Sequence, residues 1–237
     1  MISFIVPAHN EEAWIGRCVS AIRNGSESLG EPHEIIVVDD ASSDTTAAIA
    51  RQQGAQVFRV EHRHIAATRN AGARQAHGDI LFFVDADTLT NGPAIQSALR
   101  AIRAGAIGGG SVPRFEGWLP WWFKLIEPLI NPAIRLARFL PSGTFLFCTR
   151  SAFQATGGFN EKYYAAEEVA FVAALKRHGR FAILAETVVT SGRKFREHSF
   201  LSIARLFIRL ILRGPSGLRT RRGLDYWYEP EREKAKL

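Results

Sequence analysis

Cysteine is scarce in this chain of 237 residues, which has only Cys18 and Cys148. Two cysteines exclude a disulfide scaffold and a zinc cage, and they fit a reducing compartment, where each packs as a small hydrophobic residue. The first residues form an apolar run without a basic leader, so we expect no secretory signal. The sequence also lacks repeats and low-complexity stretches. Because 46% of the residues are hydrophobic and 22% are charged, the composition is typical of a globular protein with a buried core.

Most of the chain has no excess of positive charge. Residues 1–175 have 15 Lys and Arg against 17 Asp and Glu, whereas residues 176–237 have 15 against 6. Such an asymmetry is typical of contact with an anionic partner, and a solvated tail explains it equally well. No nucleic-acid-binding module accompanies the charge, so we expect no nucleic-acid partner.

Strands and helices alternate through the first half of the sequence. Apolar runs predict buried strands at 2–7, 34–39, 55–60 and 80–84. Helical spacing of apolar residues predicts helices over 11–24, 44–54, 65–76 and 92–103. Strands separated by helices imply right-handed crossovers, and therefore a mostly parallel, Rossmann-like α/β sheet flanked by helices.

This alternation ends after residue 92 and the helix that follows it. We expect a glycine-rich strand over 104–113, a strand over 142–149, and helices over 165–178 and 199–213. Residues 117–140 are rich in Trp, Leu and Ile, but prolines and charged residues interrupt them. They do not form an apolar run of the length that a membrane span requires.

Polar residues gather where three of the predicted strands end. They occupy 7–12 after the first strand, 39–40 at the end of the second, and 85–87 after the fourth. Each cluster alone is also explained by a helix cap or a turn. In open parallel sheets, however, ligands bind beyond the carboxyl ends of the strands. The coincidence of three clusters therefore favours one shared crevice.

Asp85 and Asp87 form the most informative of these clusters. Alternation along an extended segment places their carboxylates on the same face. Carboxylate oxygens suit Mg²⁺ or Mn²⁺, which bind substrate phosphates as well, so we expect a metal that holds a diphosphate. A Walker phosphate loop is absent, because the glycines at 108–110 lack the lysine and the helix start that it needs. We expect these glycines to allow close backbone packing in a strand.

Five segments together resemble family 2 glycosyltransferases. They are 5–12 (IVPAHNEE), 37–44 (VVDDASSD), 67–72 (ATRNAG), 78–87 (GDILFFVDAD) and 157–161 (GGFNE). The segments keep the order of the family, and the resemblance covers roughly residues 2–190. It implies a GT-A fold and transfer of a sugar, with inversion, from a nucleotide-diphospho-sugar, usually a UDP-sugar.

The resemblance also implies roles for the residues that bind the donor. Pro7, His9 and Glu11 match the segment that lines the nucleoside pocket, and Asp40 matches the carboxylate that accepts a hydrogen bond from the base. Asp85 would contact the ribose or sugar beside the metal. Asp87 would be the direct metal ligand, with Asp85 sharing the metal site.

Two interpretations are open for each of two arginines. Arg69 matches an element whose guanidinium lies against the donor or its diphosphate, and a helix-surface arginine is the alternative. Arg193 lies in a late basic loop that folds over the diphosphate in related enzymes, and a solvated loop is the alternative. His198 is a further candidate for the metal shell.

The catalytic base is expected in the acidic pair Glu167 and Glu168. In the family the second member of this pair, typically Asp, deprotonates the acceptor hydroxyl, so Glu168 is the match and departs from the usual residue. A further acidic position of the family is Ala170 here. Capping of a helix N-terminus is the alternative role for Glu168.

We therefore predict a GT-A domain over 1–195, with a nucleotide-binding half at 1–92 and an acceptor and catalytic half at 93–195. The second half carries an acceptor-side insertion at 113–141. The alternatives to a glycosyltransferase are a sugar nucleotidyltransferase and a nucleotide-sugar-binding module without turnover.

The segment 196–237 is predicted to form a basic amphipathic helix and a tail. Arg205, Arg209 and Arg213 recur every fourth residue beside a wide apolar face. This pattern predicts either packing on the domain or attachment to an anionic membrane surface. We expect a cytoplasmic protein, peripheral on the inner membrane face, and the acceptor is then lipid-linked or membrane-borne.

Overall fold

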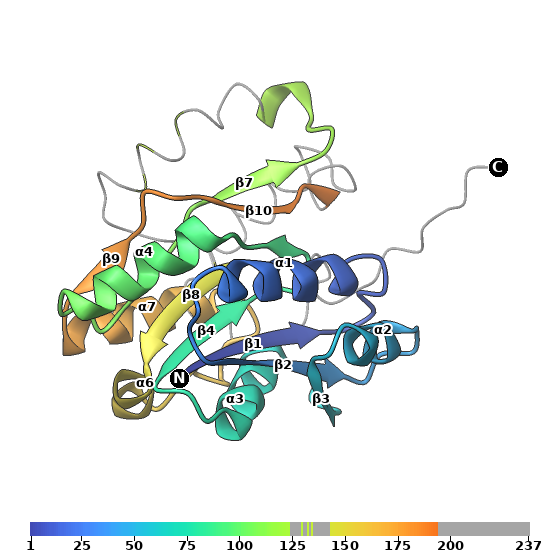
Figure 1. Ribbon diagram of the computed structural model, residues 1–237, viewed down its shortest axis with the longest axis horizontal. Coiled ribbons are helices and arrows are strands. Elements are labelled where there is room, and N and C mark those ends of the chain that lie inside the picture. Colours follow the sequence, from blue (N-terminus) through green and yellow to red (C-terminus); the bar gives the residue numbers. More distant parts are fainter. Residues whose placement is uncertain (124–128, 130–131, 133, 135–142, 194–237) are drawn as a thin grey trace.

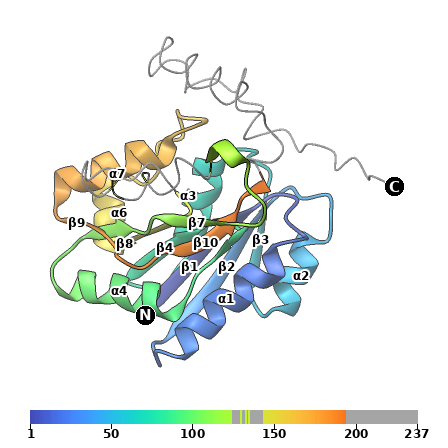
Figure 2. The same cartoon turned by 90° about the horizontal axis from the view of Figure 1, so that it is seen from above.

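The computed structural model describes residues 1–123, 129, 132, 134 and 143–193. A central sheet lies between two layers of helices, and a smaller sheet lies on the α1 and α4 side of it (Figures 1 and 2). The predicted helix at 199–213, the basic tail and much of the predicted insertion lie outside the described residues. In the described part, no helix combines the length and the apolar character needed to cross a bilayer.

Among the described residues, the large sheet has seven strands in the order β3-β2-β1-β4-β8-β6-β9. Neighbouring strands are parallel except where β8 pairs with β4 and with β6. The mostly parallel α/β sheet is therefore confirmed. Its strands are β1 Ile2–Ala8, β2 His33–Asp40, β3 Gln56–Val60, β4 Ile80–Val84, β6 Gly108–Gly110, β8 Phe145–Thr149 and β9 Phe181–Ile183.

The helices divide between the two faces of this sheet. One face carries α1 Ile15–Glu27, α2 Thr46–Gln52 and α4 Gly92–Arg103. The other carries α3 Ile65–Gln75, α6 Arg150–Thr156 and α7 Glu167–His178. Because side chains alternate along a strand, Phe4 and Val6 of β1 pack under the first set, whereas Ile5 packs under the second. Burial on both faces explains why the strands are continuously apolar in sequence.

In the part of the chain that the structure describes, the smaller sheet consists of β5 Thr88–Leu89, β10 Val188–Ser191 and β7 Pro113–Glu116. β10 lies between the other two, antiparallel to β5 and parallel to β7. The backbone N–H of Ser191 donates to the carbonyl of Asp87 over 3.1 Å. This sheet therefore brings the residues that follow β10 next to the acidic cluster that follows β4.

The predicted glycine-rich strand at 104–113 is wrong as a single element. Its centre is β6 of the large sheet, whereas its last residue, Pro113, begins β7 of the small sheet. The prediction of close packing is confirmed, because a Cβ on Gly109 would lie 2.3 Å from the carbonyl oxygen of Ala182. Glycine lets β8 and β9 approach the strand from either side.

The other predicted elements that fall within the described residues are present, with shifted ends. α1 begins at Ile15, after a turn in which the N–H of Trp14 donates to the carbonyl of Glu11 over 2.9 Å. The short elements β5, α6, β9 and β10 are additional to those predicted from periodicity. Cys18 and Cys148 are free and fully buried, as expected of small hydrophobic residues.

Candidate active site

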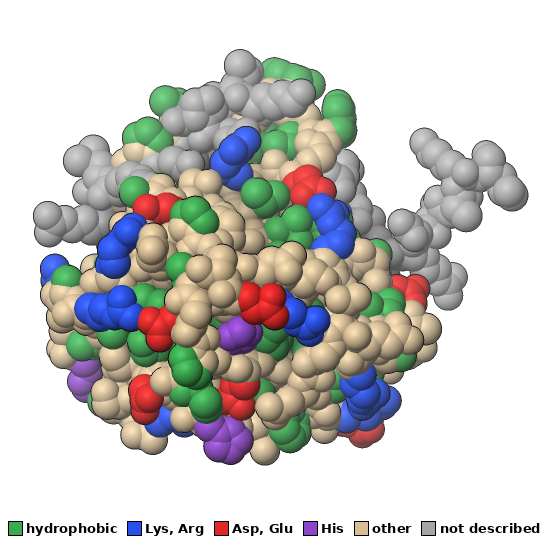
Figure 3. Space-filling view, viewed as in Figure 1, with side chains coloured by type: hydrophobic (Ala, Val, Ile, Leu, Met, Phe, Trp, Pro, Cys, Tyr) green, Lys and Arg blue, Asp and Glu red, His purple; other side chains and the backbone are tan. Residues whose placement is uncertain are grey.

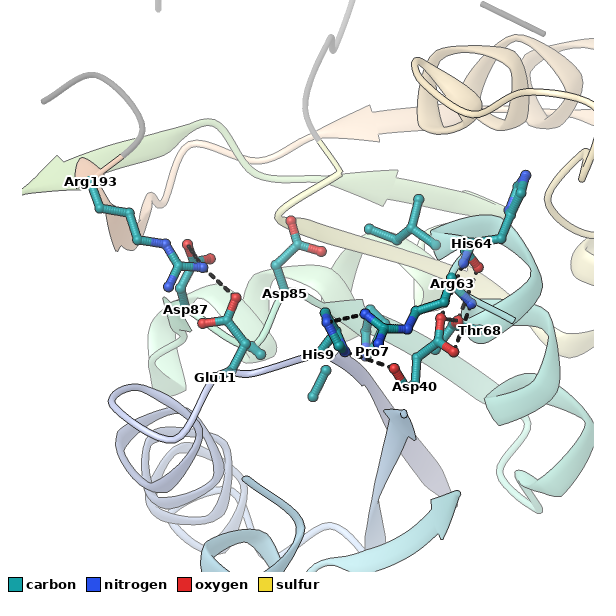
Figure 4. Close-up of a pocket in the computed structure, with 13 residues that line it drawn as sticks. Pro7, His9, Glu11, Asp40, Arg63, His64, Thr68, Asp85, Asp87 and Arg193 are labelled. Atoms are coloured by element: carbon teal, nitrogen blue, oxygen red, sulfur yellow. Dashed lines mark hydrogen bonds and ion pairs between the residues drawn. The ribbon is translucent and has the colours of Figure 1, made fainter. Parts of the chain in front are cut away.

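A pocket lies beyond the carboxyl ends of β1, β2 and β4 (Figure 4). Seven of the site residues predicted from sequence line it: Pro7, His9, Glu11, Asp40, Asp85, Asp87 and Arg193. The three clusters at the strand ends therefore do converge on one crevice. The other predicted residues, Arg69, Glu167 and Glu168, are not among the described lining residues and lie behind Asp85.

One end of the pocket is acidic, with Arg193 between two carboxylates. The guanidinium of Arg193 pairs with Glu11 and lies 3.5 Å from Oδ2 of Asp87. The hydroxyl of Thr190 donates to Oδ1 of Asp87 over 3.3 Å. Only 15% of the side-chain surface of Glu11 and of Asp87 is exposed. Carboxylates from the β1 and β4 loops thus form an anionic site that attracts a cation.

The donor set at this end fits a divalent metal that is completed by substrate. Within the described ranges, no three His, Cys, Asp or Glu side chains form a ready-made metal cage, and His198 lies outside those ranges. Mg²⁺ and Mn²⁺ are often held by one or two carboxylates together with waters and substrate phosphates. Asp87 fits that pattern. Oδ1 of Asp85 already accepts a hydrogen bond from Arg69, so Asp85 has less capacity than Asp87 to bind a metal.

Arg69 joins Asp85 to the first turn of α7. Its Nη2 donates to Oδ1 of Asp85 over 2.7 Å, and its Nη1 donates to Oε1 of Glu167 over 2.7 Å. The side chain is 2% exposed and lies over the ring of Phe159, with 5.2 Å between guanidinium carbon and ring centroid. Burial alone would lower the pKa of Arg69, but the two carboxylates raise it above its ordinary value. The alternative that Arg69 is an exposed arginine on the helix surface is wrong, because the face of α3 that carries it is buried.

Glu167 and Glu168 lie in the first turn of α7, where the helix dipole stabilises negative charge. Ala166, which precedes them, has a φ of +58°, and the helix N-terminus has no side-chain cap. Glu167 is buried and Glu168 is half-buried. Burial and the charge of Glu167 raise the pKa of Glu168 to about 8, although Arg69 acts in the opposite direction. A carboxyl whose pKa lies near neutral pH is suited to general base catalysis.

Gly143 lies against both groups. A Cβ at this position would be 2.9 Å from Nη2 of Arg69 and 3.2 Å from Cβ of Glu168. The absence of a side chain is therefore what allows the loop before β8 to close over the arginine and the candidate base.

The other end of the pocket is built on Asp40. Its carboxylate accepts hydrogen bonds from the N–H groups of His62 at 2.7 Å, Arg63 at 2.8 Å and His64 at 3.1 Å, and from the hydroxyl of Thr68 at 2.8 Å. Burial alone would raise the pKa of Asp40, but these bonds lower it below its ordinary value. Asp40 therefore fixes the turn that leads from β3 into α3.

His9 connects this turn to β1. Its Nδ1 donates to the carbonyl of Asp40 over 2.8 Å, and Arg63 donates to its Nε2. The carbonyl partner requires the proton on Nδ1, so Nε2 is the acceptor. Burial and the charge of Arg63 lower the pKa of His9, so the neutral ring with its proton on Nδ1 is favoured.

Sequence reasoning missed Arg63 and His64, which also line the pocket. Arg63 has a φ of +48°, in the left-handed region where a non-glycine residue is uncommon. A turn that places an arginine in this conformation has no sequence signature, because glycine and asparagine are the residues that mark such positions.

Known proteins are similar to this chain in sequence and in fold. The model of the family described as glycosyl transferase family 2 matches residues 3–157, more than half of the chain. A dolichol-phosphate mannosyltransferase of Pyrococcus furiosus is 30% identical over 136 residues, which are 53% of this chain and 38% of that protein. The chain spans less than half of the length of the curated relatives that it matches.

Two solved structures show that the fold is of the GT-A type. The mannosyltransferase PcManGT of Pyrobaculum calidifontis, in complex with GDP-Man and Mn²⁺, superposes with a TM-score of 0.67 at 21% identity, over 95% of this chain and 69% of that one. Glucosyl-3-phosphoglycerate synthase of Mycobacterium tuberculosis, in complex with Mn²⁺, UDP and glucosyl-3-phosphoglycerate, gives 0.64 at 20% identity, over 90% and 78%. The chain belongs to glycosyl transferase family 2.

Proposed function

We propose that this chain is a metal-dependent, inverting glycosyltransferase that moves a sugar from a nucleotide-diphospho-sugar, such as a UDP-sugar, to a hydroxyl acceptor. The observation that carries the proposal is the convergence of the strand-end carboxylates on one pocket, with an acidic helix start beside it. Related structures that contain Mn²⁺ with UDP or with GDP-Man support the donor class.

The donor would lie along the pocket. Asp87 would hold the metal, and Arg193 and the metal would together face the diphosphate. Pro7 and His9 would line the nucleoside side, whereas Glu11, which the resemblance places there, pairs with Arg193 at the acidic end. When bound, the metal supplies positive charge that stabilises the departing diphosphate.

Glu168 would act on the acceptor. As the acceptor oxygen forms its bond to the anomeric carbon, the carboxylate takes the hydroxyl proton, and the bond from that carbon to the diphosphate breaks. Attack opposite the leaving group inverts the anomeric centre. Arg69 would hold Glu167, and so the first turn of α7, in place beside Asp85.

A product assay tests this proposal. The purified chain is incubated with a panel of nucleotide sugars and Mn²⁺, and the released nucleoside diphosphate is measured. Release by the unmodified chain, with a loss in Glu168→Gln while donor binding is retained, is the expected result. Asp79→Asn is the matched control, because this exposed carboxylate lies at the amino end of β4, far from the pocket.

The released product separates the alternatives. When a nucleoside triphosphate and a sugar 1-phosphate replace the nucleotide sugar, a sugar nucleotidyltransferase releases pyrophosphate, whereas a binding module releases nothing in either incubation. If pyrophosphate appears, or if no donor is turned over, the proposal of a glycosyltransferase is wrong. An active Glu168→Gln variant would place the base elsewhere.

We further propose that the acceptor is lipid-linked and reached from a membrane surface. The relative named as a dolichol-phosphate mannosyltransferase supports this acceptor class. Trp118 and Trp121, which follow β7, are 66% and 75% exposed, and hydrophobic side chains appear over that region at the top of the molecule in Figure 3. Indole rings are favoured in the headgroup layer of a bilayer.

The segment that carries these tryptophans starts close to the pocket wall. The N–H of Gly192 donates to the carbonyl of Glu116 over 3.1 Å, so the end of β7 lies beside the residue before Arg193. Co-sedimentation with anionic vesicles tests the membrane contact. Vesicle binding should weaken in the double variant Trp118→Ser/Trp121→Ser and remain in the control Arg74→Met, which changes another surface residue. If the unmodified chain and both variants bind equally, or if none of them binds, the membrane contact is contradicted.

A further inference from the structure

The end of strand β10 holds the carboxylate of Asp87 and the arginine that faces it. The hydroxyl of Thr190 donates to Oδ1 of Asp87 over 3.3 Å, and the backbone N–H of Ser191 donates to the carbonyl of Asp87 over 3.1 Å. The hydroxyl of Ser191 accepts a hydrogen bond from the N–H of Arg193 over 3.2 Å. Two consecutive residues of the small sheet therefore contact both sides of the acidic end of the pocket (Figure 4).

A second threonine of the small sheet completes this contact. The hydroxyl of Thr88 donates to the hydroxyl of Thr190 over 3.0 Å, at the position where β5 and β10 pair. A hydroxyl has one proton to donate, and a carboxylate only accepts. The proton of Thr190 therefore goes to Asp87, and the bond between the two threonines uses the proton of Thr88. The hydrogen bonds run in one direction, from Thr88 through Thr190 to Asp87.

Packing alone does not account for the two hydroxyls. Thr88 is 0% exposed and Thr190 is 4% exposed. A buried hydroxyl costs free energy unless it is hydrogen-bonded, and valine would fill the same space in a strand without that cost. Valine is the residue at 188 and 189 of the same strand. What the threonines add is a hydrogen bond to a carboxylate that lines the pocket.

The hydroxyl of Thr190 restricts the orientation of the Asp87 carboxylate. The last torsion of an aspartate side chain has only a broad preference of its own. With Oδ1 held by Thr190, Oδ2 lies on the side of Arg193, 3.5 Å from its guanidinium. Groups that hydrogen-bond to a metal ligand fix its orientation, and their removal typically costs 10- to 100-fold in metal affinity.

We propose that Thr190 is a positioning residue for the metal that Asp87 would hold, and that Thr88 acts through Thr190. Neither threonine is among the described residues that line the pocket, so both act through Asp87. The small sheet thereby takes part in donor binding without contacting the donor. The inference rests on the proposed function, because it requires a metal beside the diphosphate.

Equilibrium titration of UDP and of GDP, each with and without Mn²⁺, tests this proposal. The measured quantity is the factor by which Mn²⁺ raises nucleotide affinity. Thr190→Val keeps the shape of the side chain but removes the hydroxyl, so it should reduce this factor by roughly tenfold. Nucleotide affinity in the absence of metal should not change. Thr156→Val is the matched control, because the hydroxyl of Thr156 donates to a carbonyl within α6, whose described residues do not line this pocket.

Thr190→Ser separates positioning from packing. This variant keeps the hydroxyl and loses a buried methyl group, so it should keep the Mn²⁺ factor of the unmodified chain while urea unfolding shows a lower stability. A role in packing alone predicts the opposite order. If Thr190→Ser loses as much of the Mn²⁺ factor as Thr190→Val does, the hydroxyl is not what positions Asp87, and the proposal is wrong.

Thr88→Val tests the first bond of the series. Thr190 keeps its own bond to Asp87 in this variant, so the Mn²⁺ factor should fall less than in Thr190→Val. The variant with both changes should lose no more than Thr190→Val alone, because the two residues act through one contact. Additive losses would contradict the role given to Thr88.

The outcomes also distinguish this inference from the proposed function. If Mn²⁺ raises the affinity of the unmodified chain for neither nucleotide, the metal dependence in the proposed function is wrong, and this inference with it. If Mn²⁺ does raise that affinity and Thr190→Val keeps the full factor, only the role of Thr190 is overturned.

Discussion

The guanidinium of Arg69 donates to the carboxylate of Glu167 over 2.7 Å, across 98 positions of sequence. The same guanidinium holds Asp85 at the end of β4. Helix α3, strand β4 and the start of α7 are therefore connected through one buried cation. The residues proposed to bind the donor and those proposed to activate the acceptor are held together by this contact.

Removing the arginine should destabilise the chain strongly. Arg69→Met leaves two carboxylates without their counter-charge, one of them buried, and loss of one partner from a buried ion pair costs about 3–5 kcal/mol. Urea unfolding measures the change in the free energy of unfolding. Arg74→Met, on the exposed side of the same helix, should change it by less than about 0.5 kcal/mol. Equal effects of the two variants would contradict the bridging role.

The activity should rise with pH through neutrality. The proposed base works only as a carboxylate, and the pKa of Glu168 is raised to about 8 by burial and by Glu167. The value of kcat/KM should therefore increase with pH until that pKa is passed. Glu168→Gln should lower kcat by about 10²- to 10⁴-fold and remove this dependence. A profile that is flat in the unmodified chain would show that Glu168 is not the titrating group.

The same pKa has a consequence for stability. A carboxyl whose pKa is higher in the folded than in the unfolded chain favours folding in its neutral form. Its contribution is fully present below the ordinary glutamate pKa and is lost as the pH rises towards about 8. Unfolding free energies of Glu168→Gln should therefore fall less over this range than those of the unmodified chain. The exposed Glu27→Gln serves as the control, and it should follow the unmodified chain.

Much of this molecule follows from local patterns in the sequence. Continuous apolar runs such as 80–84 identified strands that are buried on both faces, and helical spacing identified the helices between them. The acidic clusters could be placed in one crevice because parallel strands end at one edge of a sheet. The family resemblance supplied the roles that chemistry alone left open.

What the sequence did not reveal depends on contacts between distant residues. The burial of Arg69 requires α7 to pack over α3, and no periodicity within α3 indicates that. Arg63 enters the pocket through a backbone conformation that Asp40 imposes from another strand. The antiparallel β8 and the split of the glycine-rich segment between two sheets are likewise set by tertiary pairing, which short strands specify weakly.

A methyl group at Gly143 should disturb the catalytic side more than the fold. The new Cβ would lie 2.9 Å from Nη2 of Arg69, so the guanidinium must shift away from Asp85 or from Glu167. Gly143→Ala should lower kcat by at least about tenfold, because small misplacements of catalytic groups are costly. Nucleotide affinity, measured by titration, should change far less. A variant with normal kcat would show that the loop before β8 moves to accommodate the methyl group.

Loss of Asp87 should uncouple nucleotide binding from the metal. In the unmodified chain, Mn²⁺ and UDP together should raise the melting temperature more than either does alone, because ligands that bind only the folded state stabilise it. Asp87→Ala removes the carboxylate that is proposed to hold the metal, and it also frees Arg193 from one of its acidic neighbours. We therefore expect UDP affinity in this variant to become independent of Mn²⁺, whereas binding of UDP in the absence of metal is retained. Calorimetric titration with and without Mn²⁺ measures both quantities, and Asp79→Ala, whose exposed carboxylate pairs with the N-terminus, is the control. If Asp87→Ala keeps the metal dependence of the unmodified chain, the metal lies elsewhere.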